Sequence, residues 1–183
     1  MQQEESLVQR AKKRDPEAFE QLYEAYFDKI YRYVVLKVGN RADAEDLTQQ
    51  VFLKALESMG SFHWRGVPFS SWLFRIAHNQ VVDYFRKKSR EKTLPLDEAR
   101  TVSVSDPVAL AELRLKVEQL AAACERLSEA QREVISLRFA GGLSVAETAR
   151  AMGKSEGAAR VLQHEALVRL RRILSPGNEE SNG

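Results

Sequence analysis

FSSWLFRIAHNQVVDYFRKKS, residues 69–89, decides the fold of this chain. Its apolar residues recur at i, i+3 and i+4, which predicts a helix with one face buried against neighbouring helices. This stripe consists of Phe69, Trp72, Leu73, Ile76, Ala77, Gln80, Val81 and Tyr84. Off the stripe lie Phe74, His78, Asn79, Val82 and Phe85, followed by the cations Arg86, Lys87 and Lys88. This surplus of rings and cations is typical of a nucleic-acid surface that combines base stacking with phosphate contacts.

Two further helices are predicted before this stretch. The first begins at Asp15-Pro16, with Asp as N-cap and Pro at the first helical position, and ends at Gly39. Its apolar stripe comprises Phe19, Leu22, Tyr23, Tyr26, Phe27, Ile30, Tyr31, Val34 and Val38. The second begins at Asp43 and stops at Gly60. We expect it to bury Leu47, Val51, Phe52, Ala55 and Leu56.

The hydrophobic periodicity vanishes from Ser89 to Pro107, which indicates a linker. A helical stripe then resumes with Leu110, Leu113, Val117, Leu120, Cys124 and Leu127. The sequence therefore predicts an all-α fold of two small helical bundles, residues 1–88 and 109–175, joined by a flexible linker at 89–108 and followed by a tail at 176–183.

Composition narrows the class of protein. The chain has 183 residues, of which 44% are hydrophobic and 30% charged, as expected for compact domains in water. No apolar run reaches the roughly 18 residues of a membrane span, and the N-terminus lacks the apolar segment of a signal peptide, so we expect a cytoplasmic protein without membrane insertion. The single cysteine, Cys124, is expected to be a small buried apolar residue.

The net charge of +2 conceals two cationic segments. Residues 75–92 hold six Lys or Arg against two acids, and residues 150–172 repeat that balance. Residues 42–57 and 97–147 each carry about −3. A cationic segment alone can be a solvated helix face, but two of them beside recognition-like sequences favour nucleic-acid binding.

The run LSVAETARAMGKSEGAARVLQHEALVRLRR, residues 143–172, has the form of a helix-turn-helix. Capping boxes at Ser128-x-x-Gln131 and Ser144-x-x-Glu147 open two short helices, Gly141-Gly142 and Gly153 close them, and Ser155 caps a last helix reaching about Leu174. That helix is expected to bury Ala159, Leu162, Ala166, Leu170 and Ile173. It leaves Glu156, Arg160, Gln163 and His164 for base edges or phosphates, and Lys154, Arg169, Arg171 and Arg172 as backbone anchors. An ordinary helical hairpin with a charged face is the alternative.

Four motifs in order resemble one family over nearly the whole chain. They are AFEQLYEAYFDKIYRYV (18–34), DAEDLTQQVFLKAL (43–56), FSSWLFRIAHNQVVDYFRKK (69–88) and LSEAQREVISLRFAGGLSVAETARAMGKSEGAARVLQHEALVRLRR (127–172). Together they resemble the two-domain extracytoplasmic-function sigma factors of bacterial RNA polymerase. The resemblance implies a protein that is not an enzyme and needs no cofactor or metal. It implies binding to core polymerase, at the clamp of the largest subunit and the flap of the second, with recognition of the −10 and −35 promoter elements and opening of the duplex.

The resemblance also implies roles for particular residues. Core binding would fall to Asp43, Glu45, Asp46, Gln49 and Gln50, although helix-dipole stabilisation in a first turn also explains the three acids. The −10 element would be contacted by Phe62, His63 and Trp64 in the loop that captures a flipped base, by Arg75, Asn79 and Asp83, and by Arg86, Lys87 and Lys88. For Phe69 and Trp72, core packing is the favoured interpretation. The −35 element would be contacted by Lys154, Ser155, Glu156, Arg160, Gln163, His164, Arg169, Arg171 and Arg172.

One departure from the family pattern concerns the recognition helix. Many relatives carry a hydroxyl and a basic residue where this chain has Val161 and Leu162, and a basic residue where it has Glu165. Because an acid beside phosphates is unfavourable, the −35 sequence cannot be transferred from relatives, and Glu165 is expected to face solvent or a regulator. An anti-sigma factor is the further partner that the resemblance implies.

The sequence also allows two other classes of protein. A stand-alone helix-turn-helix regulator would share the C-terminal motif, but such regulators carry a ligand or phosphoacceptor domain with strands, whereas residues 1–88 read as helical. A metal-dependent nuclease could use Asp43, Glu45 and Asp46 with His63 or His78. The chain has no His-Glu-x-x-His, no cysteine pair and no Gly-rich phosphate loop, which weighs against that alternative.

Overall fold

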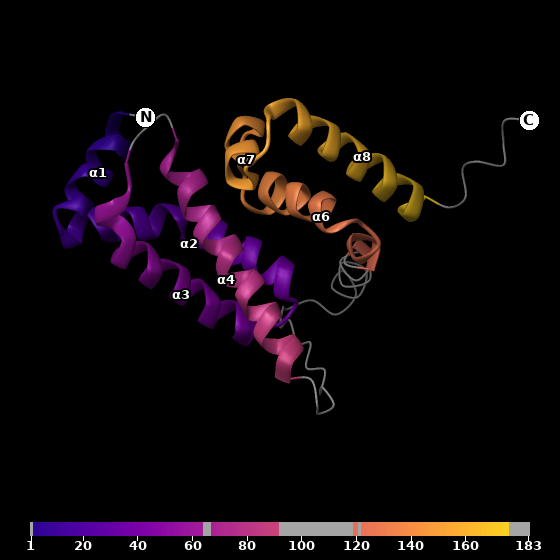
Figure 1. The fold of residues 1–183 in the computed structure, drawn as a ribbon, viewed down its shortest axis with the longest axis horizontal. Coiled ribbons are helices and arrows are strands. Elements are labelled where there is room, and N and C mark those ends of the chain that lie inside the picture. The colour runs from indigo at the N-terminus through magenta and orange to yellow at the C-terminus, as the bar shows by residue number, and fades with distance from the viewer. Residues whose placement is uncertain (1, 64–66, 92–118, 121, 176–183) are drawn as a thin grey trace, which may run out of the picture.

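The computed structural model describes residues 2–63, 67–91, 119–120 and 122–175. All regular structure in these ranges is helical, as the sequence predicts. Figure 1 shows α1 to α4 as one group and α6 to α8 as a second group beside it. The predicted linker, residues 89–108, lies outside the described ranges except for its first residues, which continue α4.

Capping residues set both ends of α2 and the start of α3. α1 spans Gln2–Lys12, and α2 spans Pro16–Val38. The carboxylate of Asp15 accepts a hydrogen bond from the N–H of Ala18, and Gly39 adopts the left-handed φ of 71° that ends the helix, which confirms both predicted boundaries. α3 spans Arg41–Ser58. It begins two residues earlier than predicted, because the side chain of Asn40 caps the N–H of Asp43.

The larger hydrophobic core lies among α1, α2, α3 and α4, the last spanning Phe69–Glu91. Aromatic rings fill much of it: Phe69 packs against Phe62, Trp72 and Tyr26 at centroid distances of 5.4–5.9 Å. Core packing of Phe69 is thereby confirmed, with 1% of the residue exposed. The predicted burial of Leu56 is wrong. That residue is 49% exposed, because α3 turns this side away from α2 and α4.

The C-terminal helices surround a smaller second core. Residues 119–120 and 122–125 are helical, α6 spans Glu129–Ile135 and continues as a π-helical turn Ser136–Ala140, α7 spans Val145–Met152 and α8 spans Glu156–Leu174. Both predicted capping boxes form. The core holds Ala123, Cys124, Leu127, Val134, Ile135, Ala166 and Leu170. Leu120 was expected in it but is 46% exposed, and Leu110, Leu113 and Val117 lie outside the described residues.

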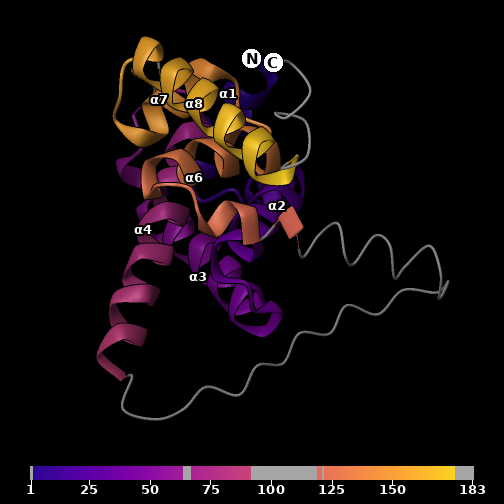
Figure 2. The ribbon, with the colours of Figure 1, turned by 90° about the vertical axis from the view of Figure 1, so that its right-hand side faces the viewer.

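The two groups of helices are in contact. α4 packs against α7 (Figures 1 and 2), and α2 packs against the π-helical turn. Leu137 and Leu143 from the C-terminal half are buried in the larger core. Phe74 is fully buried there, edge-on to Tyr33 at 5.5 Å, so its predicted place on an exposed stacking surface is wrong. The apolar residues of α4 outside its main stripe are therefore explained by packing against the C-terminal half.

Within the part of the chain that the structure describes, no helix is both long and apolar enough to cross a bilayer.

Candidate nucleic-acid interface

One face of α4 presents four of the residues predicted to contact the −10 element. Arg75, Asn79, Asp83 and Arg86 are all exposed. At about 100° per residue they lie within a sector of roughly 80° around the helix. Asp83 accepts a hydrogen bond of 3.0 Å from Arg86, which holds the two side chains together at the surface. The arrangement offers cations for phosphates beside an amide that can read a base edge.

Lys88 faces a different direction, about 180° around α4 from Asn79. Its ammonium donates to the hydroxyl of Tyr84 at 2.6 Å, lies 3.6 Å from a carboxylate oxygen of Asp43 and sits 5.0 Å from the centre of the Tyr84 ring. The hydrogen bond to Tyr84 raises the pKa of Lys88. Lys88 therefore joins α4 to α3 in this structure. It does not share a face with the other residues of α4 that are predicted to contact phosphates.

The loop before α4 is only partly described. Phe62 is 3% exposed, and its ring packs against Phe69 and Trp72 at 5.9 and 5.0 Å. A base could stack on Phe62 only if this part of the core opened, so the structure gives that residue a packing role. His63 is exposed, with Nδ1 2.7 Å from the carbonyl oxygen of Ser61. Trp64, the remaining residue of the predicted base pocket, lies outside the described residues.

α7, a short turn and α8 form the helix-turn-helix geometry that the sequence predicts. Ser144 and Glu147 cap α7 reciprocally, and Gly153 ends it with a left-handed φ of 64°. Ser155 then caps α8 by accepting from the N–H of Ala158. Lys154 and Ser155 are exposed at the start of α8, where free backbone N–H groups and the helix dipole favour an anion such as a phosphate.

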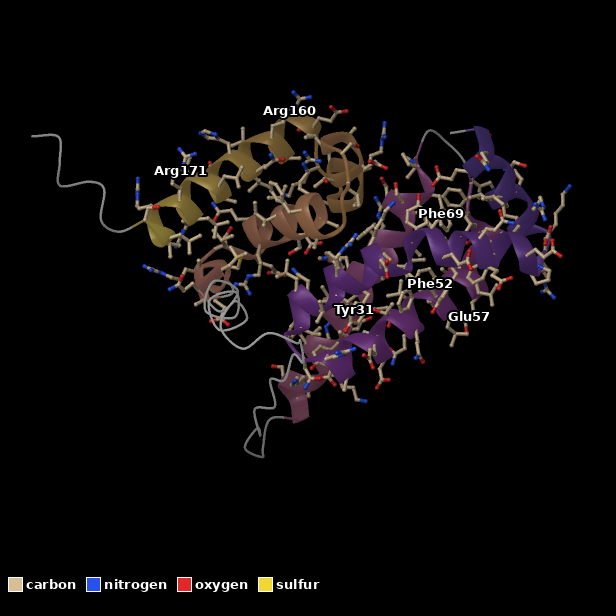
Figure 3. The ribbon with its side chains drawn as sticks, turned by 180° about the vertical axis from the view of Figure 1, so that it is seen from behind. Tyr31, Phe52, Glu57, Phe69, Arg160 and Arg171 are labelled. Atoms are coloured by element: carbon tan, nitrogen blue, oxygen red, sulfur yellow. The ribbon has the colours of Figure 1, made fainter. Side chains whose placement is uncertain are left out.

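The outer face of α8 carries Arg160, His164 and Arg171, all exposed (Figure 3 labels Arg160 and Arg171). Arg160 and Arg171 differ by only about 20° around the helix, so one surface can present both. Glu156 lies 3.5 Å from the guanidinium of Arg160. The pair is exposed and free to reorganise when a ligand arrives.

Gln163 is held by a residue that sequence reasoning missed. Arg138, on the π-helical turn, donates from Nε to the side-chain oxygen of Gln163 at 2.9 Å and from Nη1 to the carbonyl oxygen of Leu143. These two contacts fix α8 relative to the segment that precedes α7. No spacing rule in the sequence connects Arg138 with Gln163, because the π-helical turn that brings them together has no clear sequence signal.

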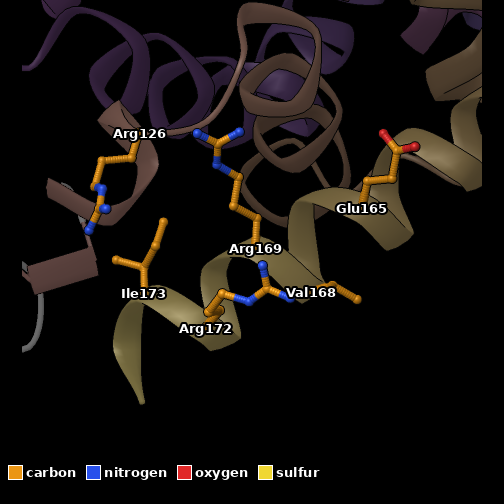
Figure 4. A pocket seen from close by; sticks show the side chains of 6 residues that line it. All are labelled: Arg126, Glu165, Val168, Arg169, Arg172 and Ile173. Atoms are coloured by element: carbon orange, nitrogen blue, oxygen red, sulfur yellow. The ribbon is translucent and has the colours of Figure 1, made fainter. Parts of the chain in front are cut away.

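Arg169 and Arg172 lie around a pocket of about 420 Å³ (Figure 4). Arg126, Glu165, Val168 and Ile173 complete its lining. Arg169 is about 180° around α8 from Arg160. A single straight duplex lying along Arg160 and Arg171 would not reach Arg169, so the predicted backbone anchors divide between two sides of this helix.

The polar residues predicted to bind core polymerase lie along α3. Glu45, Asp46, Gln49 and Gln50 are exposed, whereas Asp43 is half-buried and accepts a hydrogen bond of 2.6 Å from Tyr84. Two apolar residues, Leu53 and Leu56, extend this face at 59% and 49% exposure. The spacing of Gln49, Leu53 and Leu56 at i, i+4 and i+7 is the signal that could have placed them on one side of the helix.

The residues of the nuclease alternative are not brought together. Asp43 is bound to Tyr84, Glu45 accepts from Arg41 at 3.0 Å, and His78 lies 3.1 Å from Glu133. Among the described residues, no group of three or more His, Cys, Asp or Glu is arranged to hold a metal ion.

Comparison with protein families gives two matches in order along the chain. The family model Sigma-70 region 2 matches residues 22–91, and the family model Sigma-70, region 4 matches residues 123–172.

Curated relatives cover most of the chain. An ECF RNA polymerase sigma factor of Streptomyces coelicolor, BldN, is 44% identical over 92% of this chain, which spans 64% of that relative's length, a little under two thirds. SigX of Bacillus subtilis is 34% identical, with 90% of this chain and 87% of SigX covered. SigD of Mycobacterium tuberculosis is 32% identical, with 91% and 82% covered.

Two solved structures have a similar fold. CnrH in complex with the cytosolic domain of CnrY superposes with a TM-score of 0.72 at 24% identity, covering 94% of this chain and 97% of that one. The sigma factor RpoE in complex with the anti-sigma factor NepR from Bartonella quintana gives a TM-score of 0.70 at 25% identity, covering 87% and 98%.

Proposed function

The chain belongs to the extracytoplasmic-function sigma factors of bacterial RNA polymerase, and from that premise we propose that it binds core polymerase, recognises −10 and −35 promoter elements and initiates transcription of a specific set of genes. The observation that carries the proposal is the presence of both halves on one chain. An exposed basic face on α4 lies in the region 2 match, and a helix-turn-helix lies in the region 4 match.

The proposed −10 contacts come from one face of α4 and the loop before it. Asn79 reads a base edge, with Asp83 beside it, while Arg75, Arg86 and Lys87 bind phosphates. His63 and Trp64 belong to the loop proposed to hold a flipped base, where stacking or polar contacts offset an unstacking cost of a few kcal/mol. Phe62 acts indirectly by packing the loop, and Lys88 acts indirectly by pairing with Asp43 and so joining α4 to α3.

The proposed −35 contacts come from the start and the outer face of α8. Arg160 reads a base edge in the major groove, with Glu156 and His164 beside it, and Arg171 binds a phosphate. Lys154 and Ser155 bind phosphate at the helix N-terminus. Gln163, which Arg138 holds, positions the helix rather than reading a base.

The proposed contact with core polymerase is the exposed face of α3. Glu45, Asp46, Gln49 and Gln50 provide its polar part, and Leu53 and Leu56 provide an apolar centre. Polar and charged residues around a small apolar patch are typical of an interface in which charge sets the orientation and the apolar centre supplies the affinity. The clamp of the largest subunit is the proposed partner here, and the flap of the second subunit is proposed to bind the C-terminal half.

The protein is proposed to act in the cytoplasm, to contribute no catalytic residue of its own and to be restrained by an anti-sigma factor. A complex with an anti-sigma factor is known for the 25% identical RpoE, which supports that last partner.

Run-off transcription with purified bacterial core polymerase tests the proposal. We expect core polymerase with this chain to start at a defined set of genomic promoters, and core polymerase alone to start at none of them. Mutated −10 and −35 elements in the same templates serve as controls. If the chain binds promoter DNA tightly by itself and adds no promoter-specific initiation to core polymerase, it is a stand-alone regulator and the proposal is wrong.

A further inference from the structure

A buried carboxylate connects the two halves of the protein. Glu133 on α6 is 5% exposed. It accepts a hydrogen bond of 2.7 Å from the hydroxyl of Tyr33 and one of 2.6 Å from the ammonium of Lys37, both on α2. Its Oε1 also lies 3.1 Å from Nδ1 of His78 on α4. We call Tyr33, Lys37, His78 and Glu133 the Glu133 cluster.

The cluster favours one docking geometry of the two halves. Burial alone opposes ionisation of Glu133, but the hydrogen bond from His78 and the charge of Lys37 outweigh it and lower the pKa of that carboxyl to about 2. A buried ion pair adds little general adhesion, because desolvation offsets most of the attraction. Loss of one partner is nevertheless costly, since it leaves an unpaired charge in the interface.

Further contacts join the two halves outside the cluster. A Cβ atom built on Gly141 would lie 2.7 Å from a ring carbon of Phe74, so this glycine lets the C-terminal half approach α4 closely. The hydroxyl of Ser70 donates to a carboxylate oxygen of Glu147 at 2.5 Å, and that of Ser71 donates to the Glu147 carbonyl oxygen at 3.1 Å. Glu147 is also the residue that completes the capping box of α7.

Docking uses a residue from the proposed −10 face. The guanidinium of Arg75 donates to the carbonyl oxygen of Arg150, on α7, at 2.7 Å. Asn79 lies about 6 Å along α4 from Arg75, and even a fully extended chain from Arg150 to Arg160 would reach only about 36 Å. The −10 and −35 positions are about 25 base pairs apart, or roughly 85 Å of B-form DNA. Docked halves cannot span that distance on a straight duplex.

We propose that the face of α2 and α4 carrying Tyr33, Lys37 and His78 is a docking site for the chain's own segment α6–α7. Glu133 is the residue that this site recognises. Docking then holds the free protein in a form that is unable to contact both promoter elements. The last part of this proposal rests on the proposed function. The docking itself does not, because it needs neither polymerase nor DNA.

A distance measurement on the full chain tests the docking. Fluorescent labels are placed by Glu24→Cys on α2 and Ser175→Cys after α8, both exposed positions, in a Cys124→Ala background. Energy transfer between the labels is followed through a urea titration, and helix content is followed by circular dichroism in the same samples. Glu133→Gln is compared with Glu57→Gln, the same chemical change at an exposed ion pair with Lys54.

Glu133→Gln is expected to lower the ratio of docked to separated protein by roughly 100-fold. Its labels should then separate at a lower urea concentration than in the parent, before helix content is lost. Lys37→Met should lower the separating urea concentration in the same way. The double variant should separate at nearly the same urea concentration as Glu133→Gln alone, because both changes remove the same ion pair. Separation of the Glu133→Gln labels at the same urea concentration as those of Glu57→Gln, or only together with helix loss, would overturn the docking proposal.

Binding of a promoter fragment by the free chain tests the consequence. If docking restrains the free protein, Glu133→Gln should bind the fragment more tightly than Glu57→Gln. Easier separation of the labels without any gain in DNA affinity would leave docking supported and overturn the restraint. Failure of run-off initiation would instead overturn the proposed function, and the docking proposal would still be decided by the distance measurement.

Discussion

The hydroxyl of Tyr33 on α2 and the carboxylate of Glu133 on α6 lie 2.7 Å apart, although 100 positions separate them in the sequence. Tyr33 is fully buried, so its hydroxyl has no access to water in this arrangement. Burial, followed by the neighbouring charge of Glu133, raises the pKa of this phenol, which therefore remains a donor throughout the physiological range. The bond joins a helix of the region 2 half to a helix of the region 4 half.

Tyr33→Phe is expected to weaken docking of the two halves by about 1–2 kcal/mol, because it removes a hydrogen bond to a charged acceptor and leaves the ring packing unchanged. Energy transfer between the two labels during a urea titration measures the loss. Tyr23→Phe, on a more exposed ring of the same helix, is the matched control and should change docking by less than about 0.5 kcal/mol. Equal losses in the two variants would contradict the role given to the Tyr33 hydroxyl.

Docking of the two halves should depend on pH through His78. The hydrogen bond to Glu133 raises the pKa of His78 above its ordinary value of 6.5, with burial and Lys37 opposing and Glu129 adding to the effect. Because the docked form holds the proton more tightly, this contribution is complete below pH 6.5 and is lost as pH rises through the pKa of the docked form. The lowered pKa of Glu133 acts at the other end, where its contribution is lost as pH falls from 4.5 toward about 2.

The urea concentration that separates the labelled halves should therefore decrease as the pH is raised from 6 to 8.5. His78→Gln should flatten this dependence, whereas His164→Gln, on the exposed face of α8, should preserve it. The same slope in the parent and in His78→Gln would assign the pH dependence to other groups.

Arg160 and Arg171 should differ in how they affect −35 recognition, although they share a face of α8. Arg160→Ala is expected to weaken promoter use by roughly 5- to 150-fold on the preferred −35 sequence and to relax discrimination there, because a base contact is lost. Arg171→Ala should weaken binding about equally on all sequences and reduce the salt dependence by roughly one counterion. Holoenzyme binding to a set of −35 variants at several salt concentrations separates these outcomes. Identical profiles for the two variants would contradict the division of roles.

Most of the helices were predictable because their boundaries are local, although α1, Gln2–Lys12, was not predicted. Asp15, Gly39, Ser144 and Gly153 act on backbone groups within a few residues, so the sequence alone locates most of the helix ends. Asn40 shows the limit of this reasoning. Both Asn40 and Asp43 are good capping residues, and the choice between them depends on how the chain leaves α2.

Contacts between distant segments were not predictable from a helical stripe. Phe74 and His78 lie off the main stripe of α4, and the pattern alone cannot distinguish a ring that meets a base from one that meets Gly141 or a histidine that meets Glu133. Lys88 and Gln163 pose the same problem, because a long polar side chain can reach either solvent or a partner within the protein. Their partners, Tyr84 and Arg138, become evident only when the helices are packed.

Substitution of Leu53 tests the proposed polymerase contact without a large change in the stability of the protein. The residue is 59% exposed on α3, so Leu53→Ser should leave the free energy of unfolding within about 0.5 kcal/mol of the parent. If its side chain is buried against core polymerase, the same change should weaken binding by roughly tenfold or more, since burying a leucine contributes about 1.5–3 kcal/mol. Titration of labelled chain with core polymerase, read by fluorescence anisotropy, measures the affinity. Leu36→Ser, an equal change at a 40% exposed position of α2, is the control, and equal affinities for the two variants would place the contact elsewhere.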